Sequence, residues 1–270
     1  MNLLLRRKQR LTSLLELNEL PSSLRDPLYA RLIPPTLLAE LGLDPLTLNG
    51  PRDGGSVKIV ARAGKPWVRI EVWRHREDRD PLLLLDVAMT PFGVLELTFV
   101  QICDPGSERF GIDLDAQGGD TLFGTASRNL DEEARAMAAG LAPGQVRRGR
   151  RLLRRVLQAV EEFSSLLGKD LYLVEPLFYH SAILYERHGL GYLMGRDRME
   201  EIHEEFQDRG RLRSRLDGTT VFRAPGAERT VRGRSWAIHD GVLSQPWDGV
   251  KMYRLVGQKA GVDTFPGGPY

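Results

Sequence analysis

The chain has 270 residues, of which 41% are hydrophobic, enough for one large domain or for one domain with substantial extensions. Its 38 lysines and arginines nearly balance its 36 acidic residues, and the net charge of +2 argues against a general polyanion-binding surface, so any basic patch must be local. The single cysteine, Cys103, excludes an intramolecular disulfide framework and a cysteine zinc site, and we expect a cytoplasmic protein.

The first 55 residues are predicted to form a helical extension. Leucines recur at helical spacing between positions 4 and 17 and predict an amphipathic helix over residues 2–18. A second short helix is expected after Pro34-Pro35, and residues 45–55 indicate a linker. The basic face of the first helix is expected to face solvent, with a membrane surface as the alternative. No apolar stretch approaches the length of a membrane helix, so we expect no membrane partner.

A run of predicted strands follows the linker. Five segments are rich in apolar residues, several with period-two alternation, and are separated by clusters of Gly, Pro and Asp. These segments are Val57–Ala61, Trp67–Trp73, Leu82–Met89, Val94–Ile102 and Phe110–Leu114. Consecutive strands joined by short turns predict an antiparallel meander.

Helices dominate the second half of the chain. A helix is predicted over Leu130–Ala139, and the strongest helix over Arg147–Leu167, where apolar residues fall on one face. A short strand, Asp170–Glu175, and a helix ending at His188 come next. Strands first, then helix, strand and helix, predict an α/β (α+β) fold with a mixed, largely antiparallel central sheet flanked by helices. The residues beyond Gln207 are expected to be ordered but irregular.

Six arginines surround the predicted start of the strongest helix, at positions 147, 148, 150, 151, 154 and 155. Positive charge at a helix N-terminus opposes the helix dipole, so the cluster is easier to explain if an anion binds among it. Backbone amides and guanidinium groups would then hold a pyrophosphate together, and Gly149 would let the backbone come close. The alternative is a solvated face that pairs with neighbouring acids.

The strand and helix over residues 170–192 carry a motif. The strand Asp170-Leu-Tyr-Leu-Val-Glu175 is followed by a helix that ends Leu184-Tyr-Glu-Arg-His-Gly189. This order and spacing resemble the coenzyme-A-binding half of the GNAT acetyltransferase superfamily. Phe178 and Ser181 stand where the family has Asn and Ala. The alternative is a core tyrosine at a helix end that is capped by Gly189.

The resemblance implies acyl transfer to an amine, with acetyl-CoA or another acyl-CoA as donor and a small molecule or peptide as acceptor. It also implies that the pyrophosphate loop begins at Pro143, with Val146 and Arg147 in place of an Arg-Gly pair and Arg151 in place of a glycine. The cofactor-binding residues expected on this basis are Arg147, Arg148, Gly149, Arg150, Arg151, Leu152 and Ser181.

Two catalytic residues are expected from the same resemblance. In the family the tyrosine of the motif often protonates the departing thiolate, which makes Tyr185 the candidate acid. The base often comes from the strands before the pyrophosphate loop. We take Glu96 as the candidate, and the sequence does not separate it from Asp113 and Asp115.

The resemblance also sets the expected domain boundaries. Residues 1–55 form the helical extension, 56–199 the GNAT-like core, and 200–270 a C-terminal extension packed on the core. Residues 116–142 have no counterpart in the family and could form part of an acceptor pocket. A homodimer is left open.

Two other readings remain. Glu200-Glu-Ile-His203 places a carboxylate and an imidazole on one helical face, and His180, His188 and His239 lie in the same part of the chain, so an iron or zinc enzyme is the alternative. A non-catalytic GNAT-like protein that binds a ligand or RNA is the third reading, based on arginine clusters. Neighbouring acids dilute those clusters, so nucleic acid is not the expected partner.

Overall fold

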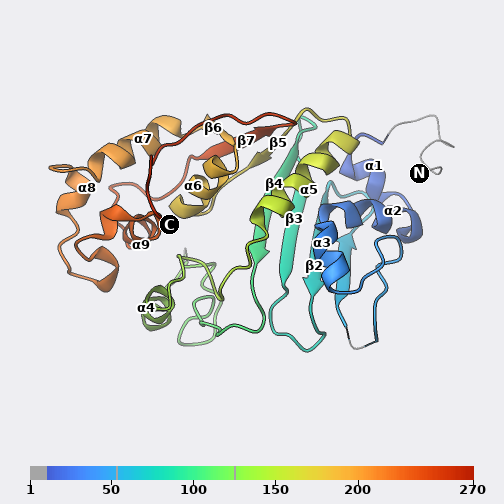
Figure 1. The fold of residues 1–270 in the computed structure, drawn as a ribbon, viewed down its shortest axis with the longest axis horizontal. Helices are drawn as coiled ribbons and strands as arrows, with labels where there is room; N and C mark the ends of the chain where they lie inside the picture. The colour runs from blue at the N-terminus through green and yellow to red at the C-terminus, as the bar shows by residue number, and fades with distance from the viewer. Residues whose placement is uncertain (1–10, 53, 125) are drawn as a thin grey trace. The chain divides into compact units, whose positions relative to one another are not determined.

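The computed structural model describes residues 11–52, 54–124 and 126–270 (Figure 1). The chain divides into two compact units, each made of three segments. Unit 1 comprises Met1–Pro105, Arg150–Val174 and Arg254–Gln258, and unit 2 comprises Gly106–Gly149, Glu175–Tyr253 and Lys259–Tyr270. These bounds cut across the three consecutive segments expected from the sequence, whose division at residues 55 and 199 stays a prediction.

Unit 1 is built on an antiparallel meander. Its strands are β1 (Ser56–Ala61), β2 (Trp67–Trp73), β3 (Leu83–Met89) and β4 (Leu95–Ile102), and β5 (Leu171–Val174) pairs parallel with β4. The full strand order is β1-β2-β3-β4-β5-β7-β6. The predicted mixed, largely antiparallel sheet with flanking helices is therefore confirmed.

One face of the meander carries the core of unit 1. The alternating residues Val68, Ile70 and Val72 are fully buried, and so is Leu85 on the next strand. Figure 1 shows the helices of this unit in front of the strands β2 to β4. These helices are α1 (Leu14–Asn18), α2 (Ser22–Tyr29), α3 (Pro35–Glu40) and α5 (Leu153–Leu166), with a 3₁₀ turn at Ala30–Leu32. Of the helix predicted over 2–18, residues 2–10 lie outside the described residues.

Unit 2 is mainly helical. Its helices are α4 (Leu130–Ala138), α6 (Tyr179–Arg187), α7 (Arg196–Glu205), α8 (Arg211–Ser214) and α9 (Val231–His239), with 3₁₀ turns at Val221–Arg223 and Ala227–Arg229. Strand β6 (Gly191–Met194) pairs antiparallel with β7 (Lys251–Leu255), which begins in unit 2 and ends in unit 1. In the described part of the chain, no helix is long and apolar enough to cross a membrane.

Two expectations about the residues that follow β4 were wrong. Phe110–Leu114 is not a strand, and only Leu114 forms a bridge, with Asp120. The side chains of Phe110 and Ile112 are buried in a small core with Val146, so packing rather than sheet pairing accounts for the apolar alternation. The region beyond Gln207 is also less irregular than expected, because it contains α8, α9 and β7.

Candidate functional site

The connection between β4 and β5 places a helix N-terminus at a sheet edge. The two strands are parallel and pair from Leu95 and Tyr172 to Leu97 and Val174. A helix that links two parallel strands runs antiparallel to them, so α5 begins at the edge where their carboxyl ends lie (Figure 1). In open sheets this edge is where ligands commonly bind.

The first turn of α5 lacks a side-chain cap from any described residue. None of their side chains bonds to the helix start at Leu152, and the first turn holds no acidic residue. The backbone amides of Leu153 and Arg154 donate to no described residue. Unsatisfied amides at a helix N-terminus attract negative charge, because the helix dipole adds to their own partial charges.

Three of the six arginines of the predicted anion site surround this helix start and have no described partner. Arg151, Arg154 and Arg155 are exposed, and none forms an ion pair or hydrogen bond through its side chain with a described residue. Arg150 differs, because its guanidinium donates two hydrogen bonds to Glu40, at 2.8 and 3.1 Å. A bidentate anion such as a phosphate suits the three free guanidinium groups and the helix amides.

The helix begins six residues later than the sequence indicated. Residues 147–152 form a loop and turn rather than the first turns of a helix. Gly149 has low helix propensity. The Arg147 side chain donates to the carbonyl oxygen of Ser107, and this bond holds the loop near Ser107 rather than in the helix. Arg148 makes only a long hydrogen bond, 3.5 Å, to the carbonyl oxygen of Ala139.

The predicted loop therefore crosses a unit boundary. Arg147, Arg148 and Gly149 belong to unit 2, whereas Arg150, Arg151 and Leu152 belong to unit 1. Arg147 holds the loop within unit 2 by its hydrogen bond to Ser107, and Arg150 forms an ion pair with Glu40 within unit 1. Arg151, also in unit 1, is exposed and pairs with no described residue of that unit.

Tyr185 and Ser181 lie one turn apart on α6 in unit 2. Tyr185 is 7% exposed, and burial raises the pKa of its phenol. The hydroxyl therefore stays protonated over the range in which enzymes normally work, as a proton donor must. Ser181 is half-buried, and its amide closes the first turn of the helix on the carbonyl oxygen of Phe178, at 3.0 Å.

The acid of the Leu-Tyr-Glu motif has a structural role. The carboxylate of Glu186 is 3% exposed and accepts hydrogen bonds from the Tyr192 hydroxyl and from the amide and hydroxyl of Thr264, the latter two at 2.9 and 2.6 Å. Burial raises the pKa of Glu186 despite these bonds. Gly189, at φ +89°, ends the helix as the expected cap.

The candidate bases lie in different surroundings. Glu96 is half-buried on β4, where it is paired in register with Ala88 of β3 and Leu173 of β5. Asp113 accepts two hydrogen bonds from Arg109, and Asp115 closes a turn by accepting from two backbone amides. Both aspartates are thus engaged in local structure.

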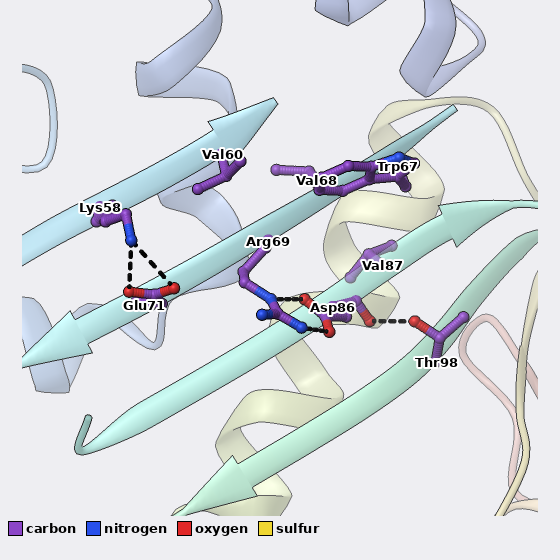
Figure 2. Close-up of a pocket in the computed structure, with 9 residues that line it drawn as sticks. All are labelled: Lys58, Val60, Trp67, Val68, Arg69, Glu71, Asp86, Val87 and Thr98. Carbon is purple, nitrogen blue, oxygen red and sulfur yellow. Dashed lines mark hydrogen bonds and ion pairs between the residues drawn. The ribbon is translucent and has the colours of Figure 1, made fainter. Parts of the chain in front are cut away.

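A groove lies on the outer face of the meander, opposite the core. Its cavity volume is about 480 Å³, and it lies entirely within unit 1 (Figure 2). Nine residues line it: Lys58, Val60, Trp67, Val68, Arg69, Glu71, Asp86, Val87 and Thr98. The sequence had assigned these residues to strands, but it gave no reason to expect a groove.

Unit 2 holds a charged network that sequence reasoning missed. The buried carboxylate of Glu133, on α4, bonds to Arg128 and lies 3.2 Å from His239 Nε2. Arg128 also bonds to Asp240 at 2.7 Å, and Asp240 bonds to Arg223 at 2.8 Å. His239 lies 106 residues from Glu133 along the chain, so no local pattern could reveal the pair.

The histidines proposed as metal ligands are held by other groups. His180 is buried, and its Nδ1 lies 2.9 Å from Ser235 Oγ. The Nδ1 of His203 lies 3.2 Å from a guanidinium nitrogen of Arg234. Within the described residues, no group of three or more His, Cys, Asp or Glu side chains is placed to hold a metal ion.

Comparison with known proteins adds no relative. No protein-family model, no curated protein and no solved structure matches this chain.

Proposed function

We propose that this chain binds an acyl-CoA at the amino end of α5 and transfers the acyl group to an amine. The observation that supports the proposal best is the uncapped start of α5, surrounded by the unpaired Arg151, Arg154 and Arg155 at the carboxyl edge of a parallel strand pair. These groups fit the charge of a pyrophosphate, and the similarity of residues 184–189 to the GNAT motif suggests coenzyme A as its carrier.

The resemblance implies roles in the transfer for two side chains. When bound, the thioester supplies an acyl group that is activated toward amines. Tyr185, on α6 of unit 2, is the acid that the resemblance implies, and burial keeps its phenol protonated, as a proton donor must be. Glu96 is the base that the resemblance implies for removing the proton of the amine. It lies between the core residues Leu95 and Leu97 on β4, so its side chain is on the outer face of the sheet, away from α5.

Isothermal titration of the whole protein with acetyl-CoA and with CoA tests the binding step. We expect the triple variant Arg151→Ala, Arg154→Ala, Arg155→Ala to weaken binding at least about 100-fold, because each charged hydrogen bond contributes roughly 1.5–3 kcal/mol. The matched control is Arg62→Ala, Arg76→Ala, Arg79→Ala, which removes three other exposed arginines of unit 1 and should leave binding unchanged.

The transfer step is tested by release of free thiol from acetyl-CoA in the presence of a panel of amines. Tyr185→Phe should lower kcat and leave the dissociation constant for acetyl-CoA unchanged, because the phenol acts on the leaving group. Absence of binding by either coenzyme A species at millimolar concentration contradicts the proposal. Binding of RNA oligonucleotides that weakens steeply with salt would instead favour the RNA-binding reading.

A further inference from the structure

The outer face of the meander carries two ion pairs side by side. Arg69 of β2 donates two hydrogen bonds to Asp86 of β3, at 2.7 and 2.6 Å. Lys58 of β1 lies 3.3 Å from Glu71 of β2 (Figure 2). In both pairs the cation is on the strand nearer the β1 edge, and the anion is one strand further in. Across this face β1 therefore carries a cation, β2 one charge of each sign and β3 an anion.

The cations of these pairs are accessible, whereas the carboxylates are largely covered. The side chains of Arg69 and Lys58 are 44% and 64% exposed, whereas those of Asp86 and Glu71 are 21% and 12% exposed. The half-buried Trp67 adds a large apolar surface to the same groove. The helices that cover β2 to β4 in unit 1 lie on the opposite face (Figure 1).

We infer that a second copy of this chain docks on this face, with the two-fold axis parallel to the strands and between β2 and β3. Such a rotation turns one sheet over and reverses its strand order, so β2 of one copy lies over β3 of the other. Because Arg69 and Asp86 are direct partners in the register, each Arg69 then faces Asp86 of the second copy. The Arg69–Asp86 pairs of the two copies then form a ring of four alternating charges.

The charge pattern is what selects a second copy as the occupant. A two-fold interface brings the same surface patch together twice, so it is favourable only where the patch is complementary to itself. The Arg69–Asp86 pair meets this condition about an axis between β2 and β3, whereas the Lys58–Glu71 pair lies to one side of that axis and does not. Sheets that pack face to face lie about 10 Å apart, so the long Arg69 side chains can meet the opposite carboxylates between them.

Charge reversal tests the inference directly. Arg69→Asp gives a face with two acids at these positions, and Asp86→Arg gives a face with two arginines. Each variant alone should self-associate at least about tenfold more weakly than the wild type in sedimentation velocity, because like charges then oppose each other. The two variants mixed should form a heterodimer, since every acid of one copy then faces an arginine of the other.

Two further measurements keep the result interpretable. The double variant Arg69→Asp, Asp86→Arg restores both the internal pair and the facing pairs, so it should dimerise like the wild type even if the single variants are destabilised. Arg196→Asp breaks an exposed ion pair with Glu200 outside this face and should not change association. Dimerisation of the wild type should also weaken as salt is raised.

Two outcomes overturn the inference. One is a wild-type protein that stays monomeric at every concentration tested in low salt. The other is a mixture of the single variants that associates no better than either alone. A dimer with its axis across the strands would place Arg69 opposite Glu71 and would give this second result.

Discussion

At the scale of single residues, His180 shows what burial in unit 2 does to a titratable side chain. The imidazole is 5% exposed, and burial, with a smaller effect of the nearby His239, lowers its pKa from 6.5 to about 3. The folded protein therefore keeps His180 neutral at pH values where the unfolded chain binds a proton. Stability attributable to this residue is fully present above pH 6.5 and is lost progressively as the pH falls toward about 3.

This linkage predicts a measurable pH dependence. Between pH 7 and pH 5 the free energy of unfolding of the wild type should fall by about 2 kcal/mol more than that of His180→Asn, which cannot take up a proton. Urea unfolding at a series of pH values measures the difference. The control is His75→Asn at an exposed position, which should keep the wild-type slope. Identical slopes for His180→Asn and the wild type would contradict the argument.

At the scale of elements, the sequence correctly predicts the strands that local periodicity specifies. The four strands β1 to β4 lie within about a residue of their expected bounds, because alternating apolar residues and Gly or Pro turns specify them. The same reasoning is wrong for Phe110–Leu114, because alternating apolar residues show which side chains are buried but not whether a sheet or another element buries them. The predicted start of α5 is wrong as well, because the bond between Arg147 and Ser107 joins residues 40 apart in the chain.

The start of α5 also supports a prediction about stability. Arg154 and Arg155 lie in the first turn, which contains no acidic residue and where positive charge opposes the helix dipole. The variant Arg154→Glu, Arg155→Glu should therefore raise the free energy of unfolding by roughly 0.5–2 kcal/mol while it abolishes binding of acetyl-CoA. Urea unfolding and titration of the same preparation measure both effects.

The matched control for this variant replaces two exposed residues in the middle and last part of the same helix. Gln158→Glu and Ser165→Glu lie outside the first turn, so they should not stabilise the helix through its N-terminus. A loss of stability in the Arg154→Glu, Arg155→Glu variant would show that the arginines have structural partners, and the anion-site argument would lose its main support.

At the scale of the whole molecule, contacts between residues that are distant in sequence determine features that local sequence patterns do not reveal. β7 lies between β5 and β6 in the sheet although it follows β6 by 56 residues of chain, from Met194 to Lys251. The Trp236 indole donates to the carbonyl oxygen of Leu141, 95 residues away. These pairings have no local signature, so the candidate acid Tyr185 could be identified by its motif, whereas its surroundings could not.

The same contacts predict that a core ending at residue 199 does not fold on its own. Without residues 200–270, β6 loses its partner β7, and the buried carboxylate of Glu186 loses both hydrogen bonds from Thr264. The Tyr192 hydroxyl still donates to Glu186 in this fragment, but a buried carboxylate that loses two donors costs several kcal/mol, which is a large part of the stability of a typical domain. We expect the 1–199 fragment to show no cooperative unfolding in circular dichroism, and the 200–270 fragment added in trans to restore it. Cooperative unfolding of 1–199 alone would show instead that the boundary expected from the sequence is a true domain boundary.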